Sequence, residues 1–309
     1  MKIYRFAFIF SLLAFACSSS KKIERPIPQG LEKSLLWQIS GNGLEKPSYL
    51  FGTIHMLCED DASLSDSLKA AIEHSERIYL ELDMDNLFEM LGALRHMKMR
   101  NDTSLADLLS ADDYIKVKTF MENKNIMMPF SELETYKPLL ASSILLESSM
   151  PCNSPVAMEQ LIMQEAKNNK KRIDGLETMA YQMSIFDSIP YKLQAEQLLK
   201  YITTDGSASN EEKEFEEMMQ AYKEQDLEKL AQQISKNEND MSPYEEILLY
   251  NRNRNWVQKL KTIMQERPVT IAVGAGHLPG EKGVINLLRK EGFTVKAVKS
   301  DFTNKTKKI

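Results

Sequence analysis

The chain lacks a basic excess and is sparing with histidine and cysteine. Its 39 Lys and Arg residues are outnumbered by 44 Asp and Glu residues, which gives a net charge of −5 with both signs interleaved. Proteins that bind nucleic acid usually carry a basic stripe, so we expect no nucleic-acid partner. With four histidines and three cysteines in the chain, imidazole and thiol chemistry can come from only a few positions.

Long apolar runs and the commonest zinc-protease motif are also missing. The apolar run at residues 6–16 is shorter than the roughly 20 residues that a transmembrane helix needs. The absence of a His-Glu-x-x-His motif excludes an ordinary zincin. The chain that follows this run is long enough for one large α/β domain or for a core with a helical insertion.

The first residues have the organisation of a signal peptide. Lys2 and Arg5 precede the apolar run, and small residues precede Cys17. A cysteine in this place resembles a bacterial lipobox, in which the cysteine is lipidated and becomes the new N-terminus; an ordinary secretory signal cleaved nearby is the alternative. We predict a signal peptide over residues 1–16, a lipid on Cys17 and a tether over residues 17–30. The expected location is the bacterial cell envelope, on the outer membrane and facing the periplasm.

Short β-branched runs alternate with helical patterns through the rest of the chain, which is typical of an α/β fold. We expect one domain over residues 31–300, built on a central mixed β-sheet with βαβ units flanked by helices, and a tail over residues 301–309. Methionine-rich helices at residues 86–155 and polar helices at residues 190–250 are expected to form helical insertions or a lid. The expected strands span residues 35–40, 47–55, 77–83, 171–176, 269–273 and 293–298. The expected helices span residues 63–75, 87–99, 104–109, 111–123, 138–146, 156–168, 179–186, 192–202 and 281–290.

Two of the expected strands run into the same motif, Gly-x-x-His. One ends in Gly52-Thr-Ile-His55, and another leads into Gly274-Ala-Gly-His277 and starts a βαβ unit over residues 268–298. Parallel strands end at the same edge of a sheet, and open α/β sheets bind their ligands at that edge. We therefore expect His55 and His277 to meet across one cleft. Two capped strand ends with incidental histidines are the alternative.

Carboxylates and one arginine accompany these strand ends. Glu81 and Asp83 alternate with apolar residues and share one face at the end of a strand. Burying two carboxylates there is unfavourable unless they bind something, and a solvated rim is the alternative. Glu177 also falls at the end of a strand. Arg252, on the helix before the second histidine strand, is expected to hold an anionic group or to pair with these carboxylates, unless that helix is a surface helix.

The two remaining cysteines suggest a cross-link. Cys58 lies three residues after His55, and Cys152 lies in a loop bounded by prolines. An exported compartment permits disulfides, so we predict that Cys58 and Cys152 are joined. Two buried free thiols are the alternative.

Several blocks of the sequence resemble the TraB/GumN family, which is related to the Tiki proteases and more distantly to the erythromycin-esterase and ChaN-like groups. The blocks run in order over roughly residues 35–300. They are Tyr49-Leu-Phe-Gly-Thr-Ile-His55, Leu80-Glu-Leu-Asp83, Gly175-Leu-Glu-Thr178 with Gln182, Arg252-Asn-Arg-Asn-Trp256 and Val273-Gly-Ala-Gly-His-Leu-Pro-Gly-Glu281. The resemblance implies an α/β core whose two Gly-x-x-His histidines and strand-end Glu form the active site. It also implies metal-dependent hydrolysis, with peptide cleavage in the Tiki branch.

Elementary metal chemistry agrees with this implication. Two imidazoles with two or three carboxylates can bind a divalent metal such as Mn, Co or Zn and leave positions open for water. The chain departs from the family pattern at Glu159, where Asp is frequent, but it keeps a carboxylate there. The predicted metal ligands are His55, Glu81, Asp83, Glu159 and His277. The predicted catalytic residues are His55, Glu81 and His277, with Glu177 as a general base or further ligand and Arg252 as an oxyanion stabiliser.

The sequence thus favours a metal-dependent, peptidase-like hydrolase of the cell envelope. Two other functions remain open. One is a metal-independent hydrolase of the esterase kind, in which a histidine with a carboxylate partner activates water. The other is a lipoprotein without enzymatic activity that binds a peptide, a metal or a haem-like ligand in the same cleft. The expected substrate of either hydrolase is a peptide or a small molecule.

Replacing the predicted lipidation site tests the export prediction. The Cys17→Ser variant is expected to lose lipid labelling and to be released from the membrane, because the thiol is the only group that this modification can use. Fractionation and labelling with a lipid precursor measure both effects. A Cys17→Ser variant that is still labelled and still sediments with membranes contradicts the prediction.

Overall fold

The computed structural model describes most of the chain after the predicted tether. Residues from Leu31 onward belong to one structural unit. The predicted signal peptide, the tether with Cys17 and the tail over residues 301–309 lie outside the described residues. The described residues are 31–300 except 125, 127, 149–151, 153–154, 205–207 and 238–241.

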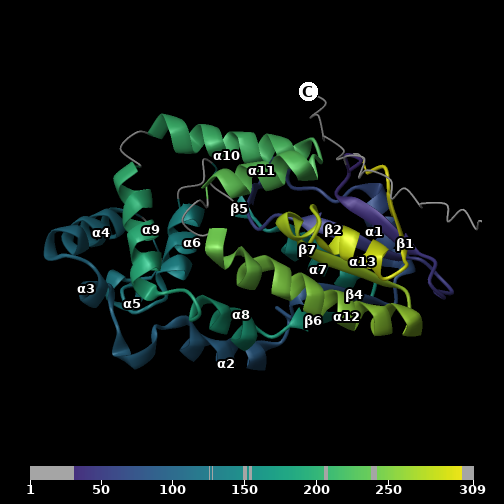
Figure 1. Cartoon of the computed structure of the whole chain (residues 1–309), viewed down its shortest axis with the longest axis horizontal. Helices are drawn as coiled ribbons and strands as arrows, with labels where there is room; N and C mark the ends of the chain where they lie inside the picture. Colours follow the sequence, from purple (N-terminus) through teal and green to yellow (C-terminus); the bar gives the residue numbers. More distant parts are fainter. Residues whose placement is uncertain are drawn as a thin grey trace, which may run out of the picture. The chain divides into compact units, whose positions relative to one another are not determined.

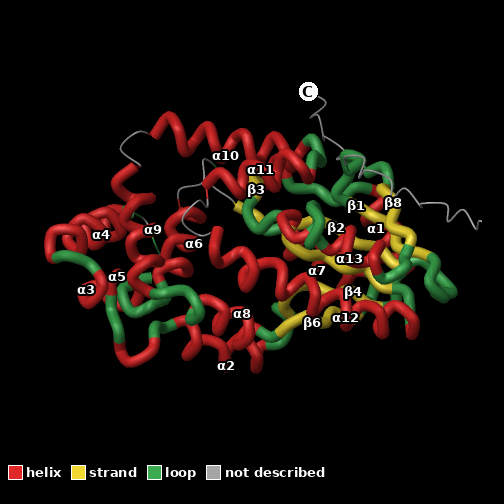
Figure 2. The backbone as a smooth tube through the Cα atoms, viewed as in Figure 1, coloured by secondary structure: helices red, strands yellow, loops and turns green. Residues whose placement is uncertain are grey.

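A six-stranded mixed sheet forms the centre of the fold, as the sequence predicts (Figure 2). Its order is β6-β4-β7-β2-β1-β8, and the first four of these strands are mutually parallel. β1 is antiparallel to both of its neighbours. The strands are β1 (Leu36–Ser40), β2 (Ser48–Thr53), β4 (Arg77–Leu82), β6 (Arg172–Glu177), β7 (Val269–Gly274) and β8 (Thr294–Ala297).

Helices cover both faces of this sheet, which explains why its central strand β7 is apolar except for Thr270, whose hydroxyl shares a hydrogen bond with Ser75. In β7, every residue from Val269 to Val273 is buried. On one face, α1 (Asp66–His74) packs on β2 and β7, and α7 (Met158–Asn168) packs on α1 and β6. On the other face lie α12 (Asn251–Glu266) and α13 (Val284–Lys290), drawn in front of the sheet in Figure 1.

The structure differs from the prediction in the βαβ unit at the C-terminal end and in the start of the helix at residue 156. Helix α13 leads from β7 to a parallel strand, but β2 and β1 lie between β7 and β8. The predicted βαβ unit is therefore a crossover that skips two strands, because the β1–β2 hairpin occupies the place beside β7. The helix expected from residue 156 begins only at Met158. Pro155–Val156 instead form β5, which pairs with β3 (Leu57–Cys58).

A second core forms among the helices that lie beyond the sheet. Its buried residues come from α3, α4, α5, α6 and α9, and they are separate from the core around the sheet. The polar helices α10 (Ala208–Lys223) and α11 (Leu227–Asn237) pack on the sheet core through Tyr222 and Leu230. The second predicted insertion is therefore divided between the two cores. The other helices are α2 (Leu87–Met97), α3 (Leu105–Leu108), α4 (Ala111–Asn123), α5 (Phe130–Leu133), α6 (Pro138–Ser148), α8 (Met179–Phe186) and α9 (Tyr191–Thr204).

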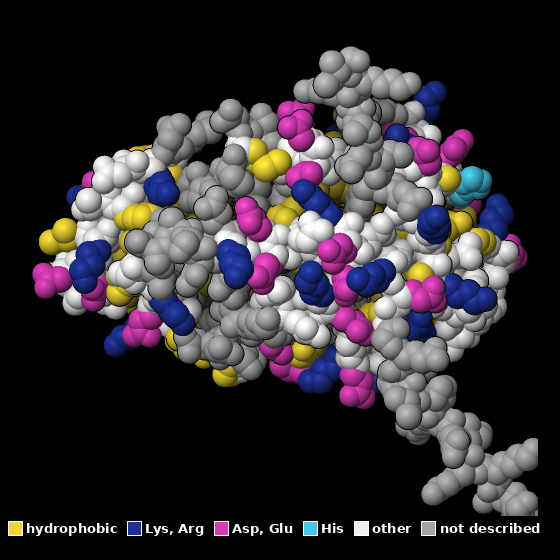
Figure 3. Space-filling view, turned by 90° about the horizontal axis from the view of Figure 1, so that it is seen from above, with side chains coloured by type: hydrophobic (Ala, Val, Ile, Leu, Met, Phe, Trp, Pro, Cys, Tyr) yellow, Lys and Arg dark blue, Asp and Glu magenta, His cyan; other side chains and the backbone are white. Residues whose placement is uncertain are grey.

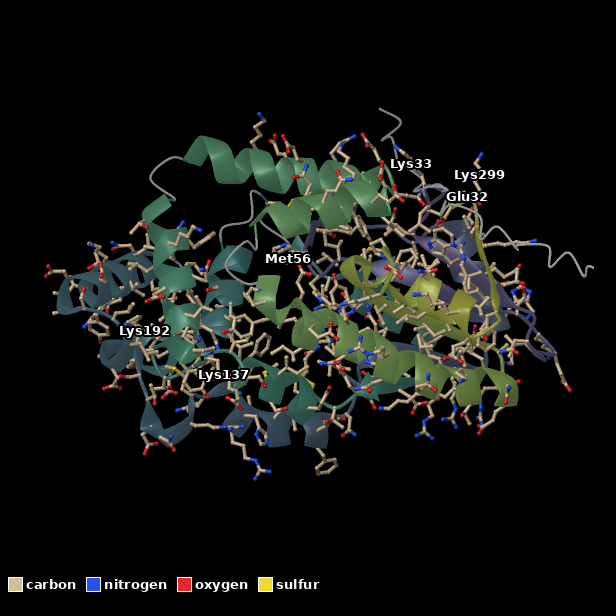
Figure 4. The ribbon with its side chains drawn as sticks, viewed as in Figure 1. Glu32, Lys33, Met56, Lys137, Lys192 and Lys299 are labelled. Atoms are coloured by element: carbon tan, nitrogen blue, oxygen red, sulfur yellow. A yellow bond between two sulfur atoms is a disulfide. The ribbon has the colours of Figure 1, made fainter. Side chains whose placement is uncertain are left out.

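A buried lysine connects the helical part to α8. The side chain of Lys137 is 1% exposed; its Nζ donates to the carbonyl oxygen of Met183 at 2.7 Å and pairs with Asp187 at 2.9 Å. Arg100 and Tyr191 also contact the Asp187 carboxylate. Figure 4 shows Lys137 among these helices. Burying an ammonium group is unfavourable unless it is paired and hydrogen-bonded, so this network fixes the end of α8 against the helical core.

The surface of the described chain mixes both signs of charge. Figure 3 shows Lys and Arg side chains beside Asp and Glu side chains on the face seen from above. Most of the large apolar side chains that are exposed lie within residues 84–94, and Phe88 on α2 is 90% exposed. Among the described helices, none combines the length and the apolar character needed to span a bilayer.

The two predicted partners Cys58 and Cys152 are joined by a disulfide. Their Cα atoms are 5.8 Å apart, and 94 positions separate them in the sequence. The bond lies next to the β3–β5 ladder, in which Cys58 faces Pro155. It therefore ties the segment after His55 to the segment before Glu159.

Removing this disulfide is expected to destabilise the protein. A Cys58→Ser/Cys152→Ser double variant should lose about 4–5 kcal/mol of unfolding free energy, because a loop of this length is no longer closed in the unfolded chain. Urea denaturation of both proteins measures the difference. Added reductant should lower the stability of the wild type and leave the double variant unchanged; a reductant effect of equal size on both proteins contradicts the assignment.

Candidate active site

Four adjacent parallel strands bring the predicted residues to one edge of the sheet. In the order β6, β4, β7 and β2, these strands carry or precede Glu177, Glu81, His277 and His55. The pairing of Thr53 with Gly274 keeps the last two strand ends level. A pocket of about 340 Å³ opens at this edge. Its polar wall consists of His55, Glu81, Gln182, Arg252 and His277.

The first glycine of each Gly-x-x-His motif permits a close approach. A Cβ atom on Gly52 would lie 3.1 Å from the Cα atom of Ala275, so glycine lets the two strand ends touch. A Cβ atom on Gly274 would lie 3.2 Å from Glu81 Oε1, and the Gly274 N–H donates to that oxygen at 2.8 Å. The motif is therefore a packing device as well as a histidine carrier.

Asn253 fixes the proton on His277. Its side-chain N–H₂ donates to the backbone carbonyl oxygens of His277 and Lys282, which turns its Oδ1 toward His277 Nδ1 at 2.6 Å. Because this oxygen only accepts, Nδ1 carries the proton and Nε2 offers a lone pair. Burial of the ring disfavours the imidazolium and lowers the pKa of His277 to about 4. His277 thus presents an unprotonated nitrogen to the pocket.

Arg252 is the centre of the charged cluster. Its Nη2 donates to Glu81 Oε2 at 2.5 Å and to Glu177 Oε1 at 2.6 Å, and its Nη1 lies 3.2 Å from His277 Nε2. The guanidinium also lies 4.8 Å from the ring of Trp256. In these contacts Arg252 pairs with the strand-end carboxylates, which is one of the two arrangements that the sequence predicts. A planar donor set suits this task better than an ammonium group would.

Glu177 is saturated by its neighbours. Its Oε1 accepts from Arg252 and Gln182, and its Oε2 accepts from the Trp256 ring N–H at 3.1 Å. Burial outweighs these hydrogen bonds and raises the pKa of Glu177. Since its oxygens are occupied, the geometry favours a role in holding Arg252 over the predicted role as a general base.

Glu81 contacts residues from several other elements at the pocket. Its Oε1 accepts from Gly274 and lies 3.8 Å from His277 Nε2, and its Oε2 accepts from Arg252 and Gln182. Burial disfavours the charge, but the His277 ring and the Arg252 guanidinium outweigh burial and lower the pKa of Glu81 to about 2. Glu81 is therefore ionised at neutral pH.

The second imidazole forms its own pair with a carboxylate. The β3–β5 ladder and a hydrogen bond from Met158 N–H to the Ile54 carbonyl bring Glu159 to His55, whose Nδ1 lies 3.0 Å from Glu159 Oε1. This hydrogen bond is the main cause that raises the pKa of His55 to about 9. The His55 side chain is 68% exposed, so solvent screens the pair and its effect on stability is small. Glu159 is buried, and its Oε2 has no hydrogen-bond partner within the described chain.

Two observations concern the predicted ligand set. Asp83 lies beyond the last residue of β4 and accepts from the backbone N–H of Asp85, so the structure does not place it with the other predicted ligands. No three His, Cys, Asp or Glu side chains in the described ranges converge enough to hold a metal ion. The reason lies in the contacts above, because the Arg252 guanidinium stands between the carboxylates and Glu159 is drawn to His55.

Sequence reasoning gave no role to Asn253, Gln182 or the apolar side of the pocket. Asn253 directly follows Arg252 on α12, so its position one residue after a predicted site residue was an available signal. Gln182 lies one turn into α8 after Glu177, and its amide bridges Glu81 and Glu177. The apolar side comes from segments without a motif, and no local pattern indicates it.

A family model matches almost the whole of the described chain. It is the model of the TraB/PrgY/gumN family, and the match covers residues 35–297. The chain belongs to this family. The match runs from the start of β1 to the end of β8 and so includes both Gly-x-x-His motifs.

The chain is also similar to curated proteins named metalloproteases. Metalloprotease TIKI1 of Danio rerio is 23% identical over 87% of this chain and 64% of its own length. Metalloprotease TIKI1 of Homo sapiens is 24% identical over 87% of this chain and 63% of its length, and a TIKI homolog of Nematostella vectensis is 20% identical over 91% and 70%. The chain thus spans less than two thirds of the first of these relatives. No solved structure matches the chain.

The buried His277 is expected to make the fold sensitive to acid. Its pKa of about 4 in the folded protein lies below the ordinary value of 6.5. As the pH falls from 7 to 5, the unfolded chain takes up a proton that the folded chain refuses, which lowers the unfolding free energy by about 2 kcal/mol. Urea denaturation, in the presence of a chelator, measures this change. Between pH 7 and pH 5 the unfolding free energy of His277→Gln should fall by about 2 kcal/mol less than that of the wild type.

The control for this experiment is His74→Gln. His74 is exposed at the end of α1, so this variant should keep the wild-type dependence on pH. Equal acid sensitivity in the wild type and in His277→Gln contradicts a neutral, buried His277.

Proposed function

We propose that this protein is a metal-dependent hydrolase of peptides that acts in the bacterial cell envelope. The observation that carries the proposal is the presence of two imidazole–carboxylate pairs whose imidazoles line one pocket. They are His55 with Glu159, and His277 with Glu81. The similarity to proteins named metalloproteases supports the same reaction class.

The donor atoms fit a divalent metal in their chemistry. His277 exposes Nε2 while Nδ1–H is held by a second side chain, which is the usual arrangement of a metal-binding histidine. Glu159 keeps one buried oxygen without a partner, an atom that a cation would satisfy. The residues that would hold the metal are His55, Glu81, Glu159 and His277, and the mixed set of nitrogen and oxygen ligands suits Mn, Co or Zn.

A bound divalent metal would supply a Lewis acid for a peptide carbonyl and for water. The chain itself supplies the rest of the chemistry. Arg252 holds a fixed positive charge at the pocket. Its N–H groups are engaged by Glu81, Glu177, His277 and the Leu248 carbonyl, so it would stabilise the negative charge on the carbonyl oxygen through its field, or directly after one of these contacts is exchanged. Glu177 and Trp256 hold the guanidinium in place, and Asn253 keeps the His277 proton on Nδ1.

One observation favours a second candidate, a metal-independent hydrolase. The Arg252 guanidinium already bridges Glu81 and Glu177 and donates toward His277 Nε2. In this reading Arg252 alone stabilises the oxyanion, and a histidine with its carboxylate partner handles the proton. The two functions differ in whether a chelator abolishes the reaction.

Membrane attachment belongs to the proposal as well. A lipid on Cys17 and a tether over residues 17–30 would hold the hydrolase at a membrane. Its partners are then that membrane and a peptide substrate, and nucleic acid is not among them. The charge balance of the chain supports the last point.

Substitution of the two motif histidines tests the metal site. His55→Ala and His277→Ala should each lose most bound metal and reduce peptide hydrolysis on the order of 100-fold or more, because each removes a ligand. The double variant should lose little further activity, since the residues act as a unit. Metal analysis, a peptide-library assay and circular dichroism measure occupancy, turnover and folding, with His74→Ala as the control.

The outcomes separate the candidate functions. Activity that survives exhaustive chelation supports the metal-independent hydrolase. Stoichiometric capture of a ligand without turnover supports a binding lipoprotein. Folded His55→Ala and His277→Ala variants that keep full metal occupancy remove the metal site, and full activity in both removes the active-site assignment.

A further inference from the structure

The pocket has two walls of opposite character. Its polar wall carries the charged cluster described above. The second wall comes from helices outside the sheet and is apolar except for Ser143 on α6. Its apolar residues are Leu140 on α6, Met183, Ile185 and Phe186 on α8, and Leu248 on the short helix η5 (Glu246–Tyr250). Neither Gly-x-x-His motif contributes to this wall. The polar wall, in contrast, combines strand-end residues with Arg252 from α12 and Gln182 from α8.

We propose that this apolar wall is a subsite for one apolar side chain of a peptide, located next to the bond that is cleaved. The proposal rests on the proposed function, because it takes peptide hydrolysis at the polar wall as given. It adds a substrate class, namely peptides with an aliphatic or methionine side chain at one defined position. Charged side chains are disfavoured there because burial against this wall would desolvate them.

The size of the pocket sets how much of the substrate it can hold. A volume of about 340 Å³ lies near the lower end of the 300–1,000 Å³ that is usual for pockets of small ligands. It accommodates one side chain with the adjoining peptide group. Selection by this wall therefore concerns a single position of the substrate.

The charges at the polar wall indicate which peptide bond is presented. Arg252 is engaged by Glu81 and Glu177, and His55 is engaged by Glu159. A free carboxy-terminal carboxylate would compete with these carboxylates for the same cations. The pocket therefore suits an internal peptide bond, which has an uncharged peptide group on each side in place of a charged terminus.

A fixed wall discriminates between side chains better than a mobile one. Lys137 donates to the backbone carbonyl of Met183 and pairs with Asp187, the residue after α8. This network holds the segment that carries Met183, Ile185 and Phe186. Truncation of Met183 at its side chain leaves the backbone contact with Lys137 in place, so it changes the shape of the wall without removing its support.

The test is a set of internally quenched peptides that differ at one residue beside the cleaved bond. The metal-loaded wild type should cleave peptides with Leu or Met about 10- to 100-fold faster, in kcat/KM, than peptides with Gly, Asp or Lys, which is the range that an apolar pocket can provide. Amidated and free-acid forms of a peptide should be cleaved at equal rates. Met183→Ala should lose about 10-fold on Leu and gain on Phe and Trp.

Two further variants complete the design. Leu140→Trp fills the subsite and should reject Leu and Met while it still cleaves the Gly peptide, so it does not depend on the folding of Met183→Ala. Leu94→Ala is the matched control, because it truncates an apolar side chain on α2 that is 52% exposed and outside the pocket. It should keep the wild-type preference.

The failures are distinguishable. If the wild type cleaves no peptide, both the proposed function and the subsite are wrong. If the wild type cleaves peptides but treats Leu, Gly and Asp alike, the subsite is wrong and the hydrolase stands. The same conclusion follows if Met183→Ala and Leu140→Trp keep the wild-type preference. A preference for free-acid peptides contradicts the cleavage of an internal bond.

Discussion

The site depends on one buried ion cluster, in which the Arg252 guanidinium binds Glu81 and Glu177 and reaches His277. These carboxylates come from two neighbouring strands, and the arginine comes from a helix on one face of the sheet. Removing one partner of a buried pair leaves an uncompensated charge and costs several kcal/mol. The cluster therefore fixes α12 against the strand ends, and with it Asn253, Trp256 and the orientation of the His277 ring.

Backbone sterics allow this cluster to form. Without side chains at Gly52 and Gly274, the strand ends approach closely enough for the Gly274 N–H to reach Glu81. The helices beyond the sheet then close the other side of the pocket. Lys137 binds the Met183 carbonyl and Asp187 and so holds α8 against these helices. The pocket thus lies between the charged strand-end cluster and the apolar side chains of α6, α8 and η5.

Much of this arrangement follows from local pattern, and the rest follows from tertiary contacts. The strand ends at His55, Glu81, Glu177 and His277 were predictable because β-branched runs and glycines mark them, and parallel strands end at one edge. Asp83 follows the last residue of β4 and does not line the pocket, because the alternation of a strand does not continue past its end. The partners of Arg252 and the role of Asn253 arise from the packing of α12, and the apolar wall arises from the helical core. Those contacts join residues far apart in the sequence, and no local spacing encodes them.

The Cys58–Cys152 disulfide has a consequence for when the protein matures. It staples the β3–β5 ladder, which brings the His55 and Glu159 half of the site together. The other half, with His277 and Arg252, is assembled by the sheet and α12 and needs no cross-link. Under reducing conditions the first half is held by the two-residue ladder and by the hydrogen bond from Met158 N–H to the Ile54 carbonyl, whereas an oxidising compartment adds the covalent cross-link. Formation of this half of the pocket thereby depends on the redox state of the compartment in which the chain folds.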